Sequence, residues 1–202
     1  MNETDRIIRE RFQVSRNDTL PYTGKARTTR NDLAKLFADL GFQTGAEIGV
    51  CKGEYSVVLL RENPECRLLL VDPYEPYLSP WNFKVTQERQ DRRLEKARER
   101  LAPYPNIEFI RKTSMEAVKD VPDGSLDFVF LDGLHDFDSA MLDVIHWTRK
   151  VRPGGVVSGH DYFYMCGGQV PDVIRAYTMA HQINSWYLTT GEKDCSWFWV
   201  KT

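Results

Sequence analysis

The chain has 202 residues, of which 42% are hydrophobic and 28% are charged, and its formal net charge is -2. A chain of this size and composition can bury one hydrophobic core, which favours a single globular domain over a disordered or fibrous protein. The small negative charge supplies no basic face for a polyphosphate backbone, so nucleic acid is not expected as a partner.

The sequence also bears on location and on disulfides. No segment is apolar enough to cross a membrane, and the first residues contain no apolar signal core. The four cysteines form no C-x-x-C pair, which argues against a structural zinc site and a disulfide framework. We therefore expect a cytoplasmic protein with one domain over residues 1–202. Its first 30 residues form an N-terminal extension, whose part in the substrate site the sequence leaves open.

In the first half of the chain, apolar residues at helical spacing alternate with short apolar runs. Helices are expected over residues 29–40, 55–61 and 85–101. Strands are expected over residues 46–50, 67–71 and 106–111. Residues 75–83, which are rich in proline and aromatic side chains, are expected to form a long irregular connection.

The alternation continues in the second half. Helices are expected over residues 114–120, 138–151 and 170–180, with strands over residues 126–131 and 156–158. Residues 152–155 are expected to form a break before the last of these strands. Residues 183–189 and 195–200 flank a glycine-containing turn and predict an antiparallel hairpin, with Trp186, Trp197 and Trp199 in the core. The pattern predicts an α/β fold: a Rossmann-like, doubly wound, mainly parallel sheet with an antiparallel C-terminal hairpin strand.

Ligands of such sheets bind beyond the carboxyl ends of the strands, where two features of this chain stand out. The strand at residues 46–50 leads into a turn containing Glu47, Gly49, Gly53 and Ser56, whose glycines let a ligand approach the backbone closely. Asp72 closes the next strand, 19 residues after Gly53. An acidic residue at about this spacing accepts hydrogen bonds from ribose hydroxyls. Together the turn and the carboxylate predict an adenosine-type cofactor.

With the pattern Glu47-x-Gly49-x-x-x-Gly53, the chain resembles class I S-adenosylmethionine-dependent methyltransferases rather than dinucleotide-binding enzymes. Two further segments are similar to signatures of methyltransferase family 24. They are Asp132-Gly-Leu-His135 and Gly154-Gly-Val-Val-Ser-Gly-His160-Asp161-Tyr162. The resemblance extends from about residue 45 to residue 202.

The resemblance implies a set of cofactor-binding residues. Glu47 and Gly49 would line the methionine end of the cofactor, with Gly53 and Ser56 in the same turn, and Asp72 would bind the ribose. Ser114 and Met115 would border the adenine, although a serine at a helix start is commonly only a cap. Asp132 would also lie at the cofactor.

Asp132, His160 and Asp161 follow two strands that should be neighbours, so they could bind one divalent ion such as magnesium. Related catechol-type enzymes hold magnesium at these strand ends. This chain has His160 where they have an aspartate, so the sequence leaves a metal requirement open. The alternative is that Asp132 and Asp161 orient the cofactor and cap loops.

His135 lies three residues after Asp132, at the offset where the catechol-type enzymes place a catalytic lysine, and is the candidate base. His135 and Asp132 are therefore the predicted catalytic residues. Aromatic residues near these strand ends could wall a substrate pocket or pack under a loop. They are Trp81, Phe83, Tyr162, Phe163 and Tyr164.

The leading interpretation is an S-adenosylmethionine-dependent methyltransferase that acts on an oxygen of a small molecule. Two alternatives are a nucleic-acid methyltransferase, against which the charge argues, and a non-catalytic protein that binds S-adenosylmethionine. A dehydrogenase ranks third, because the glycine pattern departs from that of NAD-binding enzymes. The sequence leaves open whether the chain forms a homo-oligomer.

Overall fold

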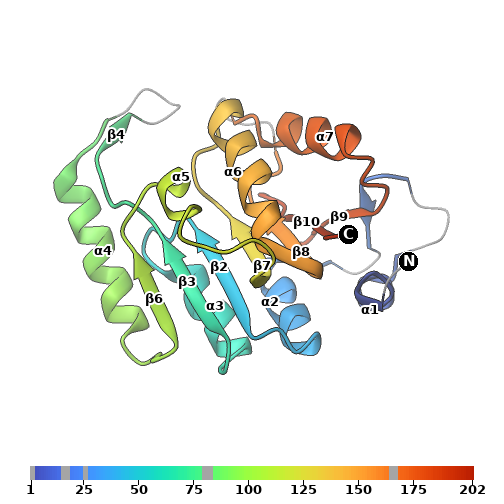
Figure 1. Ribbon diagram of the computed structural model, residues 1–202, viewed down its shortest axis with the longest axis horizontal. Helices are drawn as coiled ribbons and strands as arrows, with labels where there is room; N and C mark the ends of the chain where they lie inside the picture. The colour runs from blue at the N-terminus through green and yellow to red at the C-terminus, as the bar shows by residue number, and fades with distance from the viewer. Residues whose placement is uncertain (1–2, 15–18, 25–26, 79–83, 164–167) are drawn as a thin grey trace.

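The computed structural model describes residues 3–14, 19–24, 27–78, 84–163 and 168–202. An eight-stranded sheet forms its centre, in the order β1-β9-β10-β8-β7-β2-β3-β6 (Figure 1). The strands are β1 (Tyr22–Thr23), β2 (Thr44–Ile48), β3 (Arg67–Val71), β6 (Ile107–Ile110), β7 (Leu126–Leu131), β8 (Val151–Gly159), β9 (Trp186–Leu188) and β10 (Trp197–Val200). Two further short strands, β4 (Tyr77–Leu78) and β5 (Lys84–Val85), pair only with each other.

The directions of the strands match the predicted sheet. Strands β6, β3, β2, β7 and β8 run parallel, while β10 is antiparallel to both β8 and β9. The chain order reverses between β2 and β7, and in doubly wound sheets a ligand binds beyond the strand ends at such a point. The predicted Rossmann-like fold with an antiparallel C-terminal hairpin is confirmed.

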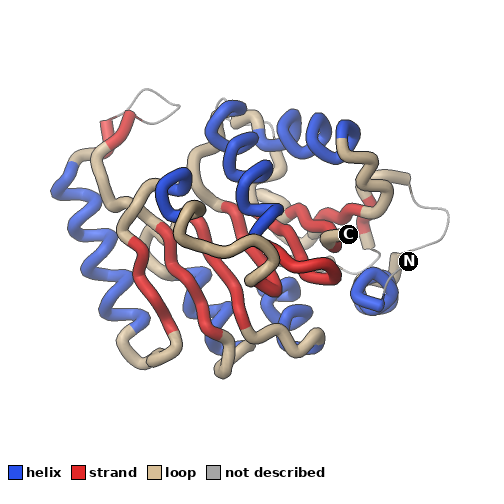
Figure 2. Tube along the Cα trace, viewed as in Figure 1, coloured by secondary structure: helices blue, strands red, loops and turns tan. Residues whose placement is uncertain are grey.

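Helices cover both faces of the sheet (Figure 2). They are α1 (Glu3–Arg11), α2 (Arg30–Asp39), α3 (Glu54–Glu62), α4 (Gln87–Leu101), α5 (Ser114–Ala117), α6 (Phe137–Lys150) and α7 (Val170–Ala180). Buried side chains of α1, α2, α3 and α4 form one apolar cluster with the sheet, and those of α5, α6 and α7 form a second. The predicted core tryptophans Trp186, Trp197 and Trp199 all lie in the second cluster.

Strand β8 departs from the prediction. It begins at Val151, directly after α6, so the expected break at residues 152–155 is wrong. Proline and glycine do not end the element here because the β7–β8 pairing is irregular: Leu126 pairs with Val151, whereas Phe128 pairs with Val156. A shift of register of this kind absorbs extra residues without ending the strand.

Two N-terminal elements were not predicted from the sequence. Ile8 of helix α1 and Phe12, which directly follows the helix, pack into the first apolar cluster, and β1 pairs in parallel with β9 near the C-terminus. Thr4 Oγ1 also donates a hydrogen bond of 2.8 Å to the Gly154 carbonyl of β8. The described elements of the N-terminal extension, α1 and β1, therefore contact the central sheet or its apolar core. None of the described helices is long and apolar enough to cross a membrane.

Candidate active site

The turn after β2 depends on glycine. Gly49 has a φ of +94°, and a Cβ atom added there would lie 2.1 Å from the Asp132 carbonyl oxygen. Gly53 also has a positive φ, +69°, where it caps α3. Glycine is the residue that adopts such conformations freely, so the two positions allow β2 to turn into α3 directly beside the end of β7.

Asp72 lies against this turn. Its Oδ2 accepts a hydrogen bond of 2.9 Å from the backbone N–H of Cys51, and its Oδ1 accepts one of 2.9 Å from the backbone N–H of Tyr74. Burial raises the pKa of Asp72, and the backbone N–H groups oppose that rise. Each carboxylate oxygen keeps a second lone pair, so the side chain combines a capping role with the capacity to accept ribose hydroxyls.

Glu47 is buried at the end of β2, where it accepts a hydrogen bond from the Ser56 hydroxyl of α3. Burial raises the pKa of Glu47 to about 8, despite the Ser56 hydrogen bond and the positive charge of Arg30. In the protein without ligands, Glu47 is therefore largely neutral at pH 7. Ser56 is fully buried and occupied by this bond.

Three side chains at the ends of β7 and β8 converge. His135 Nε2 lies 2.9 Å from Asp161 Oδ2 and 3.6 Å from Asp132 Oδ1. Burial alone would lower the pKa of His135, but the two carboxylates raise it to about 10. The ring therefore carries a proton at neutral pH, and the same contacts hold the pKa of Asp161 well below its usual range.

The backbone holds these side chains in place. Asp161 has a φ of +57°, a left-handed conformation that aspartate adopts more readily than most non-glycine residues, and it turns the chain directly after β8. The His135 carbonyl accepts a hydrogen bond of 2.9 Å from the backbone N–H of Gln169, just before α7. The loop after β7 is thereby tied to a neighbouring helix.

His160 lies beside this group but not within it. Its Nδ1 is 3.3 Å from Asp161 Oδ1, while its Nε2 is buried without a hydrogen-bond partner in the described part of the chain. The ligand atoms that lie within 4.8 Å of one another come from Asp132, His135 and Asp161. The predicted metal set of Asp132, His160 and Asp161 thus shares two members with the observed group.

Asp132 and Asp161 offer carboxylate oxygens at a separation that suits a divalent ion, and the imidazole of His135 could be a third ligand only in its neutral form. Oxygen ligands suit magnesium or manganese, and an added nitrogen ligand extends the range to other transition metals. The group is therefore chemically suited to the predicted metal site.

The predicted adenine border begins at α5. The Ser114 hydroxyl donates a hydrogen bond to the buried carboxylate of Asp143 and accepts one of 2.8 Å from Trp147 Nε1. Burial raises the pKa of Asp143 to about 6. These contacts engage the Ser114 side chain with α6, which leaves the half-buried Met115 as the apolar residue of this pair.

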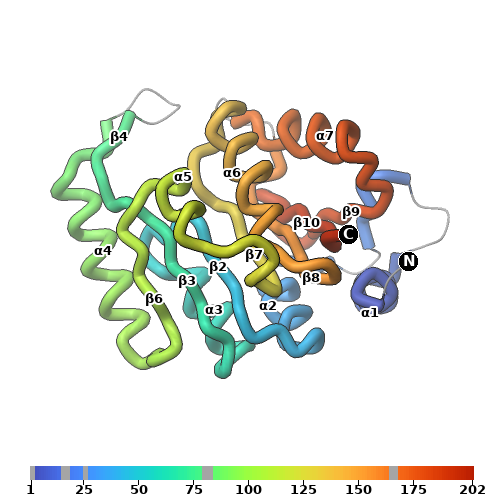
Figure 3. The backbone as a smooth tube through the Cα atoms, in the orientation of Figure 1, coloured from blue at the N-terminus to red at the C-terminus, as the bar shows by residue number. Residues whose placement is uncertain are grey.

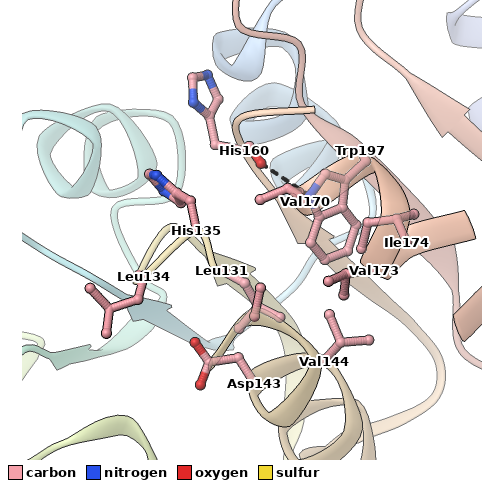
Figure 4. A pocket seen from close by; sticks show the side chains of 12 residues that line it. Leu131, Leu134, His135, Asp143, Val144, His160, Val170, Val173, Ile174 and Trp197 are labelled. Atoms are coloured by element: carbon pink, nitrogen blue, oxygen red, sulfur yellow. Dashed lines mark hydrogen bonds between the residues drawn. The ribbon is translucent and has the colours of Figure 1, made fainter. Parts of the chain in front are cut away.

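A cavity of about 20 Å³ lies beside the site, lined by His135 and His160 and by residues of β7, α6, α7 and β10. In Figure 4 the rings of His135 and His160 point away from the apolar side chains of Val144, Val173 and Ile174. A space of this size admits about one water molecule and no substrate ring.

Only some of the aromatic residues proposed as a pocket wall lie within the described part of the chain. The Tyr162 hydroxyl accepts a hydrogen bond of 3.0 Å from Arg175, and its ring packs against Trp186. This residue packs against its neighbours, which is the alternative that the sequence left open. Trp81, Phe83 and Tyr164 lie outside the described residues.

Sequence analysis missed Asp143 and Arg30. Asp143 occupies a buried position of α6 between Ala140 and Trp147, and this polar residue on an apolar helical face was the available signal. Arg30 begins α2 and lies over the Tyr55 ring, with its guanidinium carbon 5.3 Å from the ring centroid. No sequence motif links residue 30 to the strand ends.

A family model described as "Methyltransferase domain" matches residues 46–162. A curated relative, the uncharacterized protein y4gI of Sinorhizobium fredii, is 38% identical over 53 residues. That match covers 26% of this chain and only 6% of the length of the relative.

Solved structures share the fold. A putative O-methyltransferase from Klebsiella pneumoniae has a TM-score of 0.61 and 15% identity, with 100% of this chain and 91% of that chain covered. An O-methyltransferase from Bacillus cereus in complex with SAH has a TM-score of 0.60 and 15% identity, with 100% and 92% covered. TomG, an O-methyltransferase from Streptomyces achromogenes in complex with SAM, has a TM-score of 0.58 and 20% identity, with 100% and 91% covered.

Proposed function

The chain belongs to the methyltransferase domain family matched over residues 46–162, and from this premise we propose that it transfers a methyl group from S-adenosylmethionine to an oxygen of a small molecule. The observation that carries the proposal is the contact between Asp72 Oδ2 and the Cys51 N–H, 2.9 Å apart. It joins a ribose-binding carboxylate to a glycine turn. O-methyltransferases among the structural neighbours support the choice of oxygen as acceptor.

Five of the predicted cofactor residues have a defined role in this proposal. S-adenosylmethionine supplies an activated methyl group on a sulfonium. Asp72 accepts hydrogen bonds from the ribose hydroxyls, and Gly49 leaves its backbone open to close approach. Glu47, held by the buried Ser56 hydroxyl, lies at the methionine end, and its carboxyl would be favoured in the ionised form beside a positively charged ligand. Met115 borders the adenine.

Asp132, His135 and Asp161 provide the catalytic part of the proposal. A divalent ion held by Asp132 and Asp161, with the imidazole of His135 left free of the ion, would stabilise the negative charge that develops on the acceptor oxygen. His135 can remove the acceptor proton only after losing its own, because its pKa is about 10 beside the two carboxylates. Neutralising those carboxylates would lower this pKa and make the imidazole available as a base.

The direct test uses S-adenosylmethionine labelled in its methyl group. The purified protein is incubated with pools of small phenols, catechols and sugars, with magnesium or manganese and, separately, with a chelator. We expect label in a small organic product, and a smaller yield for His135→Ala with cofactor affinity unchanged. Label in added nucleic acid instead would favour the nucleic-acid alternative, and binding without transfer to any acceptor would favour the non-catalytic one.

A further inference from the structure

Arg30 occupies a position fixed by both ends of the chain. Its backbone N–H donates a hydrogen bond of 2.7 Å to Glu192 Oε1, in the turn between β9 and β10. The backbone N–H of Thr190, from the same turn, donates a 3.0 Å hydrogen bond to the Thr28 carbonyl. The C-terminal hairpin thus anchors the start of α2, and Figure 3 shows that α2 lies behind the central strands.

The Arg30 side chain is held but not paired. Its guanidinium lies over the Tyr55 ring at 5.3 Å, and the Tyr55 hydroxyl donates a 2.8 Å hydrogen bond to the Arg30 carbonyl. Within the described part of the chain, the guanidinium forms no hydrogen bond or ion pair, although the residue is half-buried. A half-buried guanidinium over an aromatic ring is well suited to bind a carboxylate.

The neighbours of Arg30 show at which end of the sheet this residue lies. Tyr55 packs on Phe130 of β7, with ring centroids 4.2 Å apart, and Phe130 lies 6.3 Å from the ring of His160. The positive charge of Arg30 also acts on Glu47, at the end of β2, and on His160, after β8. Arg30 therefore lies near the ends of β2, β7 and β8.

A second unpartnered group lies on this side. The His160 side chain is only 10% exposed, and its Nε2 has no hydrogen-bond partner in the described residues. Glu192 Oε1 lies 3.9 Å from this nitrogen. Two nitrogen groups that are far apart in the sequence, on Arg30 and His160, are thus available for an anion.

We propose that Arg30, assisted by His160, binds the carboxylate of the amino-acid part of the cofactor. The assignment rests on the proposed function, which puts the ribose at Asp72 after β3 and the adenine towards α5. The amino-acid end must then extend the other way, across β2 towards β7 and β8. Arg30 lies on that side, and its unpaired guanidinium matches the charge of the carboxylate.

The test compares two ligands that differ only in this carboxylate: S-adenosylhomocysteine and its decarboxylated form, S-adenosyl-3-thiopropylamine. Calorimetry measures their binding to the wild type, to Arg30→Gln and to Arg30→Lys. Lys35→Gln, which removes one positive charge elsewhere on α2, is the matched control. Circular dichroism and thermal unfolding of each variant report whether it folds.

We expect Arg30→Gln to weaken S-adenosylhomocysteine binding about 10- to 100-fold and to leave binding of the decarboxylated ligand unchanged. Arg30→Lys should recover part of the loss, and Lys35→Gln should bind both ligands normally. Equal losses for both ligands, or no loss for either, would overturn the role of Arg30 while leaving the proposed function intact. A wild type that binds neither ligand would overturn the proposed function itself.

Discussion

Single side chains at the strand ends have charge states that differ from their usual ones. Glu47 is largely neutral at pH 7 because burial raises its pKa to about 8, whereas His135 is charged because Asp132 and Asp161 raise its pKa to about 10. In each case the side chain holds a proton at neutral pH. Perturbed pKa values of this kind are typical of functional sites.

The His135 pKa can be measured directly. The Cε1–H resonance of His135, assigned through its loss in His135→Gln, should titrate with a midpoint near 10 instead of near 6.5. Asp161→Asn should lower this midpoint by about one unit or more, because one carboxylate is lost. Since the folded-state pKa is raised, the contribution of His135 to stability is complete below pH 6.5 and declines as the pH rises towards 10. A midpoint near 6.5 in the wild type would contradict the observed contacts.

The backbone of the turn between β2 and α3 leaves no room for a side chain at Gly49. Gly49→Ala should destabilise the protein by roughly 2–4 kcal/mol, because a Cβ there meets backbone atoms of Asp132 in addition to the positive φ. Gly124→Ala is the control, since Gly124 also has a positive φ but open space around it. Urea denaturation gives both free energies of unfolding. If both variants lost the same free energy of unfolding, the close approach of residue 49 to Asp132 would contribute nothing to the destabilisation.

The sequence predicted the elements whose signals are local. The apolar run of β3 and the helical spacing of α7 gave the same bounds as the structure, and the glycines of the turn and Asp72 do lie together. It could not predict β8 through Pro153, because the continuation depends on an irregular register with β7. Nor could it place Ser56 against Glu47, since that pairing depends on how α3 packs over β2.

Residues near the N-terminus and residues near the C-terminus contact each other in the folded protein. Asp5 of α1 is buried and accepts hydrogen bonds from Ser185 and Tyr187, and Arg9 lies over the Tyr22 ring. The two hydrogen bonds of Asp5 join residues about 180 positions apart, which no local pattern reveals. The C-terminal hairpin also holds Arg30 near the strand ends, because Glu192 accepts a hydrogen bond from the Arg30 backbone N–H. The N-terminal extension therefore supplies a candidate ligand-binding residue that sequence analysis left unnamed.

Calorimetric titration with S-adenosylmethionine, and separately with NAD, tests the central claim most directly. The account predicts saturable binding of S-adenosylmethionine by the wild type, no heat from NAD, and an affinity for S-adenosylmethionine that is about 10- to 100-fold weaker in a folded Asp72→Asn variant. Absence of binding at millimolar S-adenosylmethionine, tighter binding of NAD, or full affinity in the Asp72→Asn variant would contradict it.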